Sequence, residues 1–170
     1  MNGEIQVSEK RIEDFICEVL TEEAQKNALA FVAHLRASEM LIERFVYHGE
    51  DKRHWQIKYK DEIVCYILLN DPDDETMSWT IMPDNSSTNR FAEFQADENI
   101  RETAWKNLNI CHNGNCGGCS QGTGTRKKIF GKEIDNVCGM AYNFTNPSVM
   151  ALELAKLMMD TRKNDILENI

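Results

Sequence analysis

The spacing of apolar residues in the first forty positions is that of helices. The first apolar series follows Ser8, a residue type that often caps a helix. It consists of Ile12, Phe15, Ile16, Val19 and Leu20. Spacings of three and four residues place such a series on one helical face. Thr21, followed by Glu22 and Glu23, is typical of a new helix start. The pattern therefore predicts two helices within about 8–37, joined by a tight break.

The period then changes to that of strands. Residues 55–59 alternate between apolar and polar side chains, as in a strand with one solvated face. Asp61-Glu62 suits a turn, and residues 63–69 are apolar on both faces, which indicates a central strand. Residues 77–82 form a third strand. The connections are too short for crossover helices, so an antiparallel sheet is expected at about 54–82.

The second half of the chain gives both helix and strand signals. A helix is expected over residues 96–107, and the segment 127–134 is predicted as a strand that delivers Cys138 beside the preceding loop. Asn146-Pro147 is a strong helix start, because Asn caps and Pro suits the first helical position. The last helix is expected at about 147–164. Its inward residues are predicted to be Met150, Leu154, Leu157 and Met158.

These elements predict an α+β fold in a single domain of residues 1–170, with an N-terminal helical pair, an antiparallel sheet, a Gly/Cys-rich metal loop at 111–138 and a C-terminal helix. A hydrophobic content of 42% and a charged content of 28% are near globular averages, so wholesale disorder is not expected. The net charge of −9 repels phosphate backbones, which argues against nucleic-acid binding. The basic residues that cluster are Arg126, Lys127, Lys128 and Lys132, a group more typical of a solvated strand edge or loop.

The sequence shows no sign of secretion or membrane insertion. Residues 1–15 lack the apolar segment of a signal peptide. The most apolar run, residues 63–69, is much shorter than the ~18 apolar residues of a membrane helix. We therefore expect a cytoplasmic protein without a membrane partner, whose thiols stay reduced.

Candidate chemistry is concentrated in one glycine-rich stretch. Four of the six cysteines are Cys111, Cys116, Cys119 and Cys138, spaced C-x4-C-x2-C with eighteen residues before the last. Five of the nine glycines lie between positions 114 and 124, and glycine lets a backbone wrap closely round a small centre. Thiols clustered in this way in a reducing compartment are typical metal ligands.

The leading interpretation is a structural zinc site formed by these four thiolates. Zinc takes four soft ligands in a tetrahedron, and a short knuckle with one distant cysteine supplies them. His112 is a possible substitute ligand for the adjacent Cys111. Such a site would staple the loop to the sheet, leaving the sheet face or an aromatic pocket to bind a small molecule or a protein.

Two other chemistries use the same cysteines. The string CHNGNCGGC resembles the cluster loop of plant-type ferredoxins, which implies a [2Fe–2S] cluster and electron transfer. Cys116 and Cys119 also form a C-x-x-C unit, as in thiol-redox proteins, although the following SQGTGT is a poor helix former. Free thiols, or a disulfide formed on oxidation, are the plainer alternative. No spacing in the chain indicates a catalytic base or nucleophile.

The other two cysteines and several aromatic residues belong to apolar patterns. Cys17 and Cys65 lie in an apolar helix and an apolar strand, so both are predicted to be core residues. A ligand pocket is possible if the sheet curves over the helices, lined by Trp55, Tyr59, Tyr66 and Trp79. Aromatic residues on strands are more often part of the core, which is the alternative for all four.

Two stretches resemble known bacterial families. HWQIKYKDEIVCYILL carries the W-x-x-x-Y-K-x-x-x-V-x-Y hairpin and resembles small α+β proteins of the YdhG-like kind. That resemblance implies helices packed on a compact sheet, and an iron-handling, frataxin-like role discussed for some members. KKIFGKEIDNVC, FTNP and LAKLMMDTRKNDI are similar to uncharacterised small bacterial proteins that carry a comparable cysteine loop, and they imply no established activity.

Overall fold

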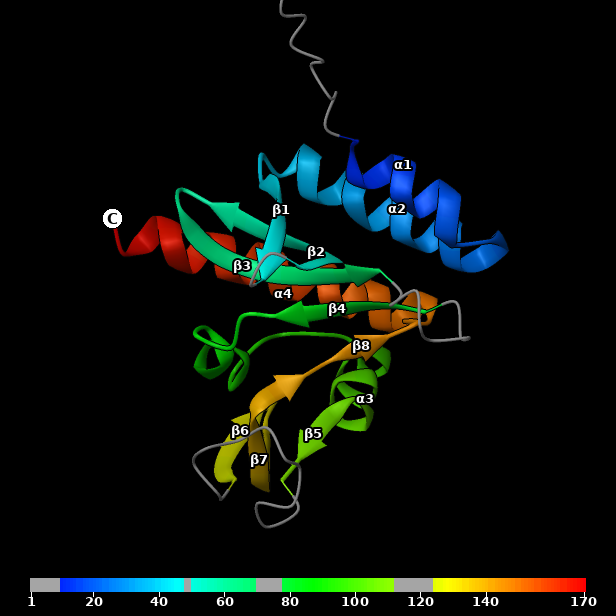
Figure 1. Ribbon diagram of the computed structural model, residues 1–170. Helices are drawn as coiled ribbons and strands as arrows, with labels where there is room; N and C mark the ends of the chain where they lie inside the picture. Colours follow the sequence, from blue (N-terminus) through cyan, green and yellow to red (C-terminus); the bar gives the residue numbers. More distant parts are fainter. Residues whose placement is uncertain (1–9, 48–49, 70–77, 112–123) are drawn as a thin grey trace, which may run out of the picture.

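The computed structural model describes residues 10–47, 50–69, 78–111 and 124–170 (Figure 1). The helices in these ranges are α1 (Ile12–Val19), α2 (Glu22–Ala37), the 3-10 helix η1 (Thr88–Phe91), α3 (Glu98–Lys106) and α4 (Val149–Glu168). The strands are β1 (Leu41–Tyr47), β2 (Glu50–Tyr59), β3 (Glu62–Leu69), β4 (Trp79–Pro83), β5 (Leu108–Ile110), β6 (Thr125–Ile129), β7 (Lys132–Tyr142) and β8 (Phe144–Thr145). None of these helices is long and apolar enough to cross a membrane.

The larger of the two sheets in the described ranges has the strand order β1-β2-β3-β4-β8 and is antiparallel throughout. The predicted meander with a central strand at 63–69 is therefore confirmed, because two strands of the sheet lie on each side of β3. The turn before β3 is Lys60-Asp61 and not Asp61-Glu62. The sequence pattern did not predict strand β1. It is an edge strand in which Leu41 is 53% exposed and Glu43 is exposed, so its apolar residues do not alternate clearly with polar ones.

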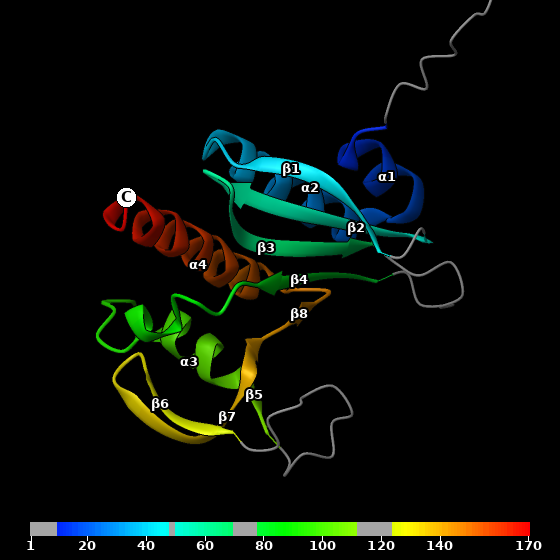
Figure 2. The same ribbon diagram turned by 60° about the vertical axis from the view of Figure 1, so that its left-hand side comes forward.

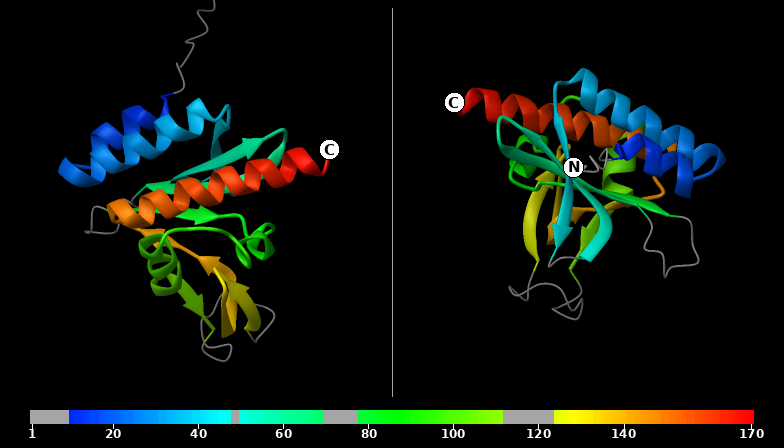
Figure 3. Two further views of the ribbon diagram at one scale, coloured as in Figure 1. Left: turned by 180° about the vertical axis from the view of Figure 1, so that it is seen from behind. Right: turned by 45° about the horizontal axis from the view of Figure 1, so that its top comes forward.

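Three helices of the described chain cover one face of this sheet, as the view from behind shows (Figure 3). The register places Trp55, Ile67 and Ile81 side by side on that face, and all three are buried. The ring of Phe15 from α1 meets Trp55 at a centroid distance of 5.3 Å. α4 lies beside α2 and contacts β3 and β4. The helical pair and the sheet thus share one core, as the apolar patterns predicted.

The helix starts differ in part from the predicted ones. α1 begins after Arg11, whose backbone N–H donates to Asp14 Oδ2 at 3.0 Å, and Ser8 lies outside the described residues. α2 begins after Thr21, and the tight break before it is confirmed by the extended backbone at Leu20 and Thr21. Acidic residues in both first turns suit the positive end of the helix dipole.

The predicted N-cap of the last helix is wrong. Ser148 caps α4, because its side chain accepts the N–H of Ala151 at 3.2 Å. Asn146 instead joins the larger sheet: its Oδ1 accepts the N–H of Trp79 at 3.1 Å, and its own N–H donates to Trp79 O at 2.8 Å. The helix also places Met150 at the surface, 37% exposed, where an inward side chain was predicted.

The smaller sheet has the strand order β5-β7-β6 and contains a hairpin where one strand was predicted. The segment 127–134 turns at Phe130 and Gly131, whose φ values of 49° and 80° suit a type I′ turn. Phe130 is buried and stacks on Phe91 at a centroid distance of 5.9 Å. The apolar side chain of Phe130 lies at the turn, and in the sequence it made the turn look like part of a continuous strand.

The two sheets are joined through β7 and β8, which follow each other directly in the chain (Figure 2). β8 pairs with β4, while β7 pairs with β5 and β6. The rings of Tyr142 and Phe144 stack across this junction at 5.6 Å. The hydroxyl of Tyr142 donates to the carbonyl of Ala104 in α3 at 3.1 Å, which holds α3 against the smaller sheet. Helix α4 contacts α3 as well as the larger sheet.

Candidate metal centre

Cys111 and Cys138 lie on adjacent strands of the smaller sheet. Cys111 directly follows β5, is buried, and donates its backbone N–H to the carbonyl of Asn136 at 2.6 Å. Ile110, the residue before it, pairs with Val137. Cys138 follows Val137 on β7 and is half-buried. Strand pairing thus places the predicted fourth ligand, Cys138, two residues along β7 from Asn136, the residue that bonds the backbone of Cys111.

The described residues on either side of the segment 112–123, which carries the other two cysteines, both contact Asn136. The residue after the segment is Gly124, where a Cβ atom would lie 2.4 Å from the backbone carbonyl of Asn136. Only glycine allows this approach, because real Cβ atoms do not come so close to backbone. Asn136 itself has a φ of 57°, at an irregularity in the β6–β7 register. Cys111 and Gly124, the residues that flank the segment, are therefore both held against the backbone of Asn136.

Cys116, Cys119 and His112 lie outside the described residues. The sequence nevertheless limits their distance from the base: Cys116 comes five residues after Cys111, and Cys119 comes five residues before Gly124. Five residues span at most about 17 Å when fully extended. The two thiol-bearing residues are therefore tethered within the same maximum distance of Cys111 and of Gly124, respectively.

Within the described ranges, no three His, Cys, Asp or Glu side chains form a group that could hold a metal ion. Two of the four predicted ligands lie in those ranges, and both are free thiols there. The base of the site is polar as well as apolar, since Asn109 Nδ2 donates to the carbonyl of Met140 at 2.8 Å.

Three basic residues of the β6–β7 hairpin interact with other side chains of the protein. Arg126 donates to the carboxylate of Asp135, which holds the pKa of Asp135 below its ordinary value. Lys128 donates to Glu93, and the ammonium group of Lys132 lies 5.0 Å from the ring centroid of Trp105. These contacts fit the prediction that the run is a solvated strand edge.

The two remaining cysteines differ from each other. Cys65 is fully buried, and burial raises the pKa of its thiol above the ordinary value, so the prediction of a core residue is confirmed. Cys17 is exposed, so the prediction of a core residue is wrong there. The buried stripe of α1 runs through Ile12 and Ile16, and Cys17 is turned about 100° from Ile16 around the helix.

The four aromatic residues of the predicted pocket do not come together. Trp55 and Trp79 are core residues, 2% and 1% exposed, each packed against a helix. Tyr66 pairs with neither of them and lies on the opposite sheet face, with its ring 6.1 Å from Phe45. Tyr59 lies under the ammonium group of Lys163 from α4. The two tryptophans are therefore core residues, as the alternative interpretation of the sequence predicted.

Sequence reasoning missed Asn136 and Gly124 as the residues that close the base of the cysteine segment. For Gly124, the glycine enrichment of the segment was a usable signal. Nothing in the pattern around Asn136 indicated a backbone contact with both ends of the segment, because that contact depends on strand register.

Comparison with known proteins does not place the chain in a family: no family model, no curated protein and no solved structure matches it. Function is therefore inferred from the residues of this chain and their arrangement.

Proposed function

We propose that this protein binds one zinc ion through the thiolates of Cys111, Cys116, Cys119 and Cys138, and that the zinc is structural. The observation that carries the proposal is the position of Cys138. It comes from the far side of the β6–β7 hairpin, yet lies two residues from Asn136, whose carbonyl accepts the backbone N–H of Cys111 at the base of the segment that bears the other two thiols. Cysteines with unrelated roles would not need to lie on neighbouring strands at the base of one cysteine-rich segment.

The chemistry of the ligands favours zinc. Four thiolates match the tetrahedral coordination that zinc takes in closed structural sites, with Zn–S distances of about 2.3 Å. Binding would link the segment 112–123 to β5 and β7, which otherwise share a short three-stranded sheet. Because the unfolded chain has no such site, the free energy of zinc binding would add to the stability of the fold.

The spacing shared with plant-type ferredoxins makes a [2Fe–2S] electron-transfer protein the second candidate. One experiment separates the two. Elemental analysis and an absorption spectrum of freshly purified, untagged protein should show about one zinc per chain and no visible absorbance. Iron and sulfide in equal amounts with visible bands would instead establish the cluster. Absence of any metal would contradict both candidates and leave a thiol pair at Cys116 and Cys119.

The cysteines also allow a matched test by substitution. Cys116→Ser and Cys138→Ser should each abolish zinc retention and lower the melting temperature by about 6–12 °C, which corresponds to about 3 kcal/mol for a chain of this size. Cys17→Ser, at an exposed position, should change neither quantity. Differential scanning fluorimetry and zinc analysis on the same samples measure both.

Cys65→Ser is a second control, because it buries a hydroxyl in an apolar core and should lower the melting temperature without loss of zinc. Retention of zinc in Cys138→Ser, with a melting temperature equal to that of Cys17→Ser, would refute the proposed site.

A further inference from the structure

Strand β7 lies between β5 and β6 in the smaller sheet and leaves its ladder where it carries Cys138 (Figure 2). Leu108 of β5 pairs with Tyr142. Two residues later, Ile110 pairs with Val137, so a single residue of β5 faces four residues of β7. These four residues, the Cys138 bulge, are Cys138, Gly139, Met140 and Ala141. The described part of β6 supplies no partner for them, since its pairing with β7 stops at Val137. A bulge of this kind bends its strand and redirects a side chain.

Two asparagine side chains hold the Cys138 bulge. Asn109 is the β5 residue that faces it, and its Nδ2 donates to the carbonyl of Met140 at 2.8 Å. Asn85 follows β4 of the larger sheet, and its Oδ1 accepts the backbone N–H of Ala141 at 3.2 Å. Backbone groups need a partner where the ladder gives none. The two amides thus replace bonds that neighbouring strands would otherwise supply.

The two asparagines are themselves fixed by different parts of the fold. The carbonyl of Asn85 accepts the N–H of Thr88 at 3.1 Å and the hydroxyl of the same residue at 2.6 Å, and Thr88 is 3% exposed. This turn joins β4 to η1, so Asn85 ties the bulge to the larger sheet. Asn109 lies on β5, two residues before Cys111. The positions of Cys138 and Cys111 are therefore linked through Asn109.

Packing explains little of the conformation in the middle of the bulge. A Cβ atom at Gly139 would meet no atom of the described chain within 4 Å, and Met140 is 44% exposed. Segments with few buried contacts open easily unless other interactions hold them. The Cys138 bulge therefore depends on its two hydrogen bonds for a fixed position.

We propose that Asn109 and Asn85 are positioning residues of the metal centre, which hold the Cys138 bulge so that the thiolate of Cys138 is in place before a metal ion binds. This inference rests on the proposed zinc site and adds two residues that bind no metal themselves. A ligand on a loose segment must be ordered when the metal binds, and that ordering costs conformational entropy. Partners that orient a metal ligand typically raise metal affinity by about 10- to 100-fold.

The test is the zinc affinity of the full, reduced chain, measured by competition with the chromophoric chelator pyridylazoresorcinol. Asn109→Ala should weaken zinc binding by about tenfold or more, and Asn85→Ala should do the same. The bond from Asn109 is exposed, so its loss should leave the fold intact. The matched control is Asn107→Ala, which removes a bond of the same kind outside the bulge, from Nδ2 to the carbonyl of Thr103 at 2.8 Å. Its zinc affinity should equal that of the unmodified chain.

Aspartate substitutions separate the hydrogen bond of each amide from its bulk. An ionised aspartate accepts hydrogen bonds but donates none. Asn85→Asp therefore keeps the bond to Ala141, whereas Asn109→Asp loses the bond to Met140, although both add the same charge. We expect Asn85→Asp to bind zinc severalfold more tightly than Asn85→Ala, and Asn109→Asp to bind it no more tightly than Asn109→Ala.

The outcomes distinguish this inference from the proposed function. Equal zinc affinities in Asn109→Ala, Asn107→Ala and the unmodified chain would overturn the positioning role and leave the zinc site standing. An Asn85→Asp variant as weak as Asn85→Ala would show that the bond to Ala141 does not position Cys138. If the unmodified chain itself bound no zinc, the proposed function would fail, and this inference with it.

Discussion

Asp165 of α4 is a mostly buried carboxylate, 13% exposed, held by residues that precede the smaller sheet in the chain. The hydroxyl of Ser87 donates to it at 2.6 Å and Nε of Arg90 donates at 2.9 Å. The hydrogen bond from Ser87, followed by those from Arg90 and by the charge of Arg162, lowers the pKa of the Asp165 carboxyl below its ordinary value. The ionised form is therefore favoured by folding.

This shift predicts how stability depends on pH. A carboxyl with a lowered pKa in the folded state adds stability above its unfolded pKa of about 3.9 and loses that contribution as the pH falls through the folded pKa. Asp165→Asn should therefore lower the free energy of unfolding at pH 7, and the deficit should shrink as the pH falls below about 4. Urea unfolding at a series of pH values measures it.

The control is Asp61→Asn, in an exposed turn where Asn also suits the φ of 67°. Its difference from the unmodified protein should be small at every pH. A deficit in Asp165→Asn that stayed constant down to the lowest pH would show that the charge of Asp165 is not what folding favours.

The two cysteines outside the candidate metal centre show how well the burial of a single residue can be predicted from its sequence neighbours. Cys65 and Cys17 both lie among apolar residues, yet the first is buried and the second exposed. Cys65 lies on the helix-covered face of β3 together with the buried Ile67 and Leu69, whereas Tyr66 and Leu68 between them are only half-buried. A two-turn helix buries one stripe, and a shift of one residue from Ile16 was enough to place Cys17 in solvent.

At the scale of elements, the start of α4 depends on two residues with different tasks. Ser148 satisfies an N–H group of the first helical turn. Asn146, at a φ of 45°, exchanges two hydrogen bonds with Trp79 and so fixes the end of β8 against β4. The chain can enter the helix in the right direction because the strand before it is held in place.

Substitutions separate these tasks. Ser148→Ala should lower the free energy of unfolding by about 1 kcal/mol, the usual cost of an N-cap. Asn146→Ala should cost about 2 kcal/mol, because it loses the bond to the N–H of Trp79 and replaces Asn, which tolerates positive φ, by Ala, which adopts it less readily. Asn146→Gly relieves the backbone and should fall between the unmodified protein and Asn146→Ala.

Thermal and urea unfolding of the three variants measure these costs. If Asn146→Gly equalled the unmodified protein, the side-chain bond to Trp79 would contribute nothing. If Ser148→Ala cost more than Asn146→Ala, Asn146 would not be the main link between β8 and β4.

The hairpin at Phe130 shows why element boundaries were the weakest part of the sequence analysis. Its first turn residue is a buried aromatic at positive φ, which local preference opposes. The backbone is held there by η1: the N–H of Phe130 donates to Phe91 O at 2.8 Å, and the N–H of Gly131 donates to Ala92 O at 2.9 Å. Packing with a distant segment therefore overrode the local apolar pattern.

At the scale of the whole molecule, α4 connects the parts of the fold, and Arg162 is its central contact. The side chain of Arg162 is 13% exposed. It donates to the carbonyl of Ile63 at 3.2 Å, lies 3.3 Å from the carboxylate of Asp84, and reaches the hydroxyl of Ser87 at 3.5 Å. One side chain on the last helix thus joins β3, the end of β4 and the approach to η1.

Removal of this contact should affect global stability. We expect Arg162→Ala to lower the free energy of unfolding by about 2–4 kcal/mol, because it removes a cation that is only 13% exposed together with its contacts to the carbonyl of Ile63 and the carboxylate of Asp84. Arg90→Ala is the matched control: Arg90 also bonds Asp165 but is 46% exposed, so its loss should cost about 1 kcal/mol or less. Equal costs in chemical denaturation would show that the burial of Arg162 does not matter.

The sequence by itself determined the elements whose cause is local. Both N-terminal helices, the antiparallel meander and the approximate extent of α3 and α4 follow from apolar periodicity, since each element must bury one stripe or face. Composition and cysteine spacing likewise located the candidate chemistry, because ligand type and glycine content are properties of the sequence.

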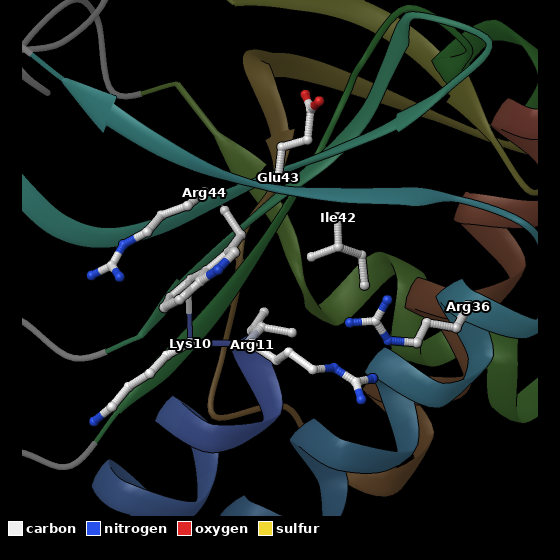
Figure 4. A pocket seen from close by; sticks show the side chains of 8 residues that line it. Lys10, Arg11, Arg36, Ile42, Glu43 and Arg44 are labelled. Atoms are coloured by element: carbon white, nitrogen blue, oxygen red, sulfur yellow. The ribbon is translucent and has the colours of Figure 1, made fainter. Parts of the chain in front are cut away.

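Tertiary structure decided everything that needs contact between distant segments. Strand register brought Cys111 and Gly124 onto Asn136, two residues before Cys138 on β7. The packing of α1 and α2 on the sheet edge brought Lys10 and Arg44 to one pocket (Figure 4), although nothing in the sequence around either residue differs from an ordinary surface charge. Periodicity reports which face of an element is buried, but which elements meet depends on the whole core, and the candidate metal centre lies where such elements meet.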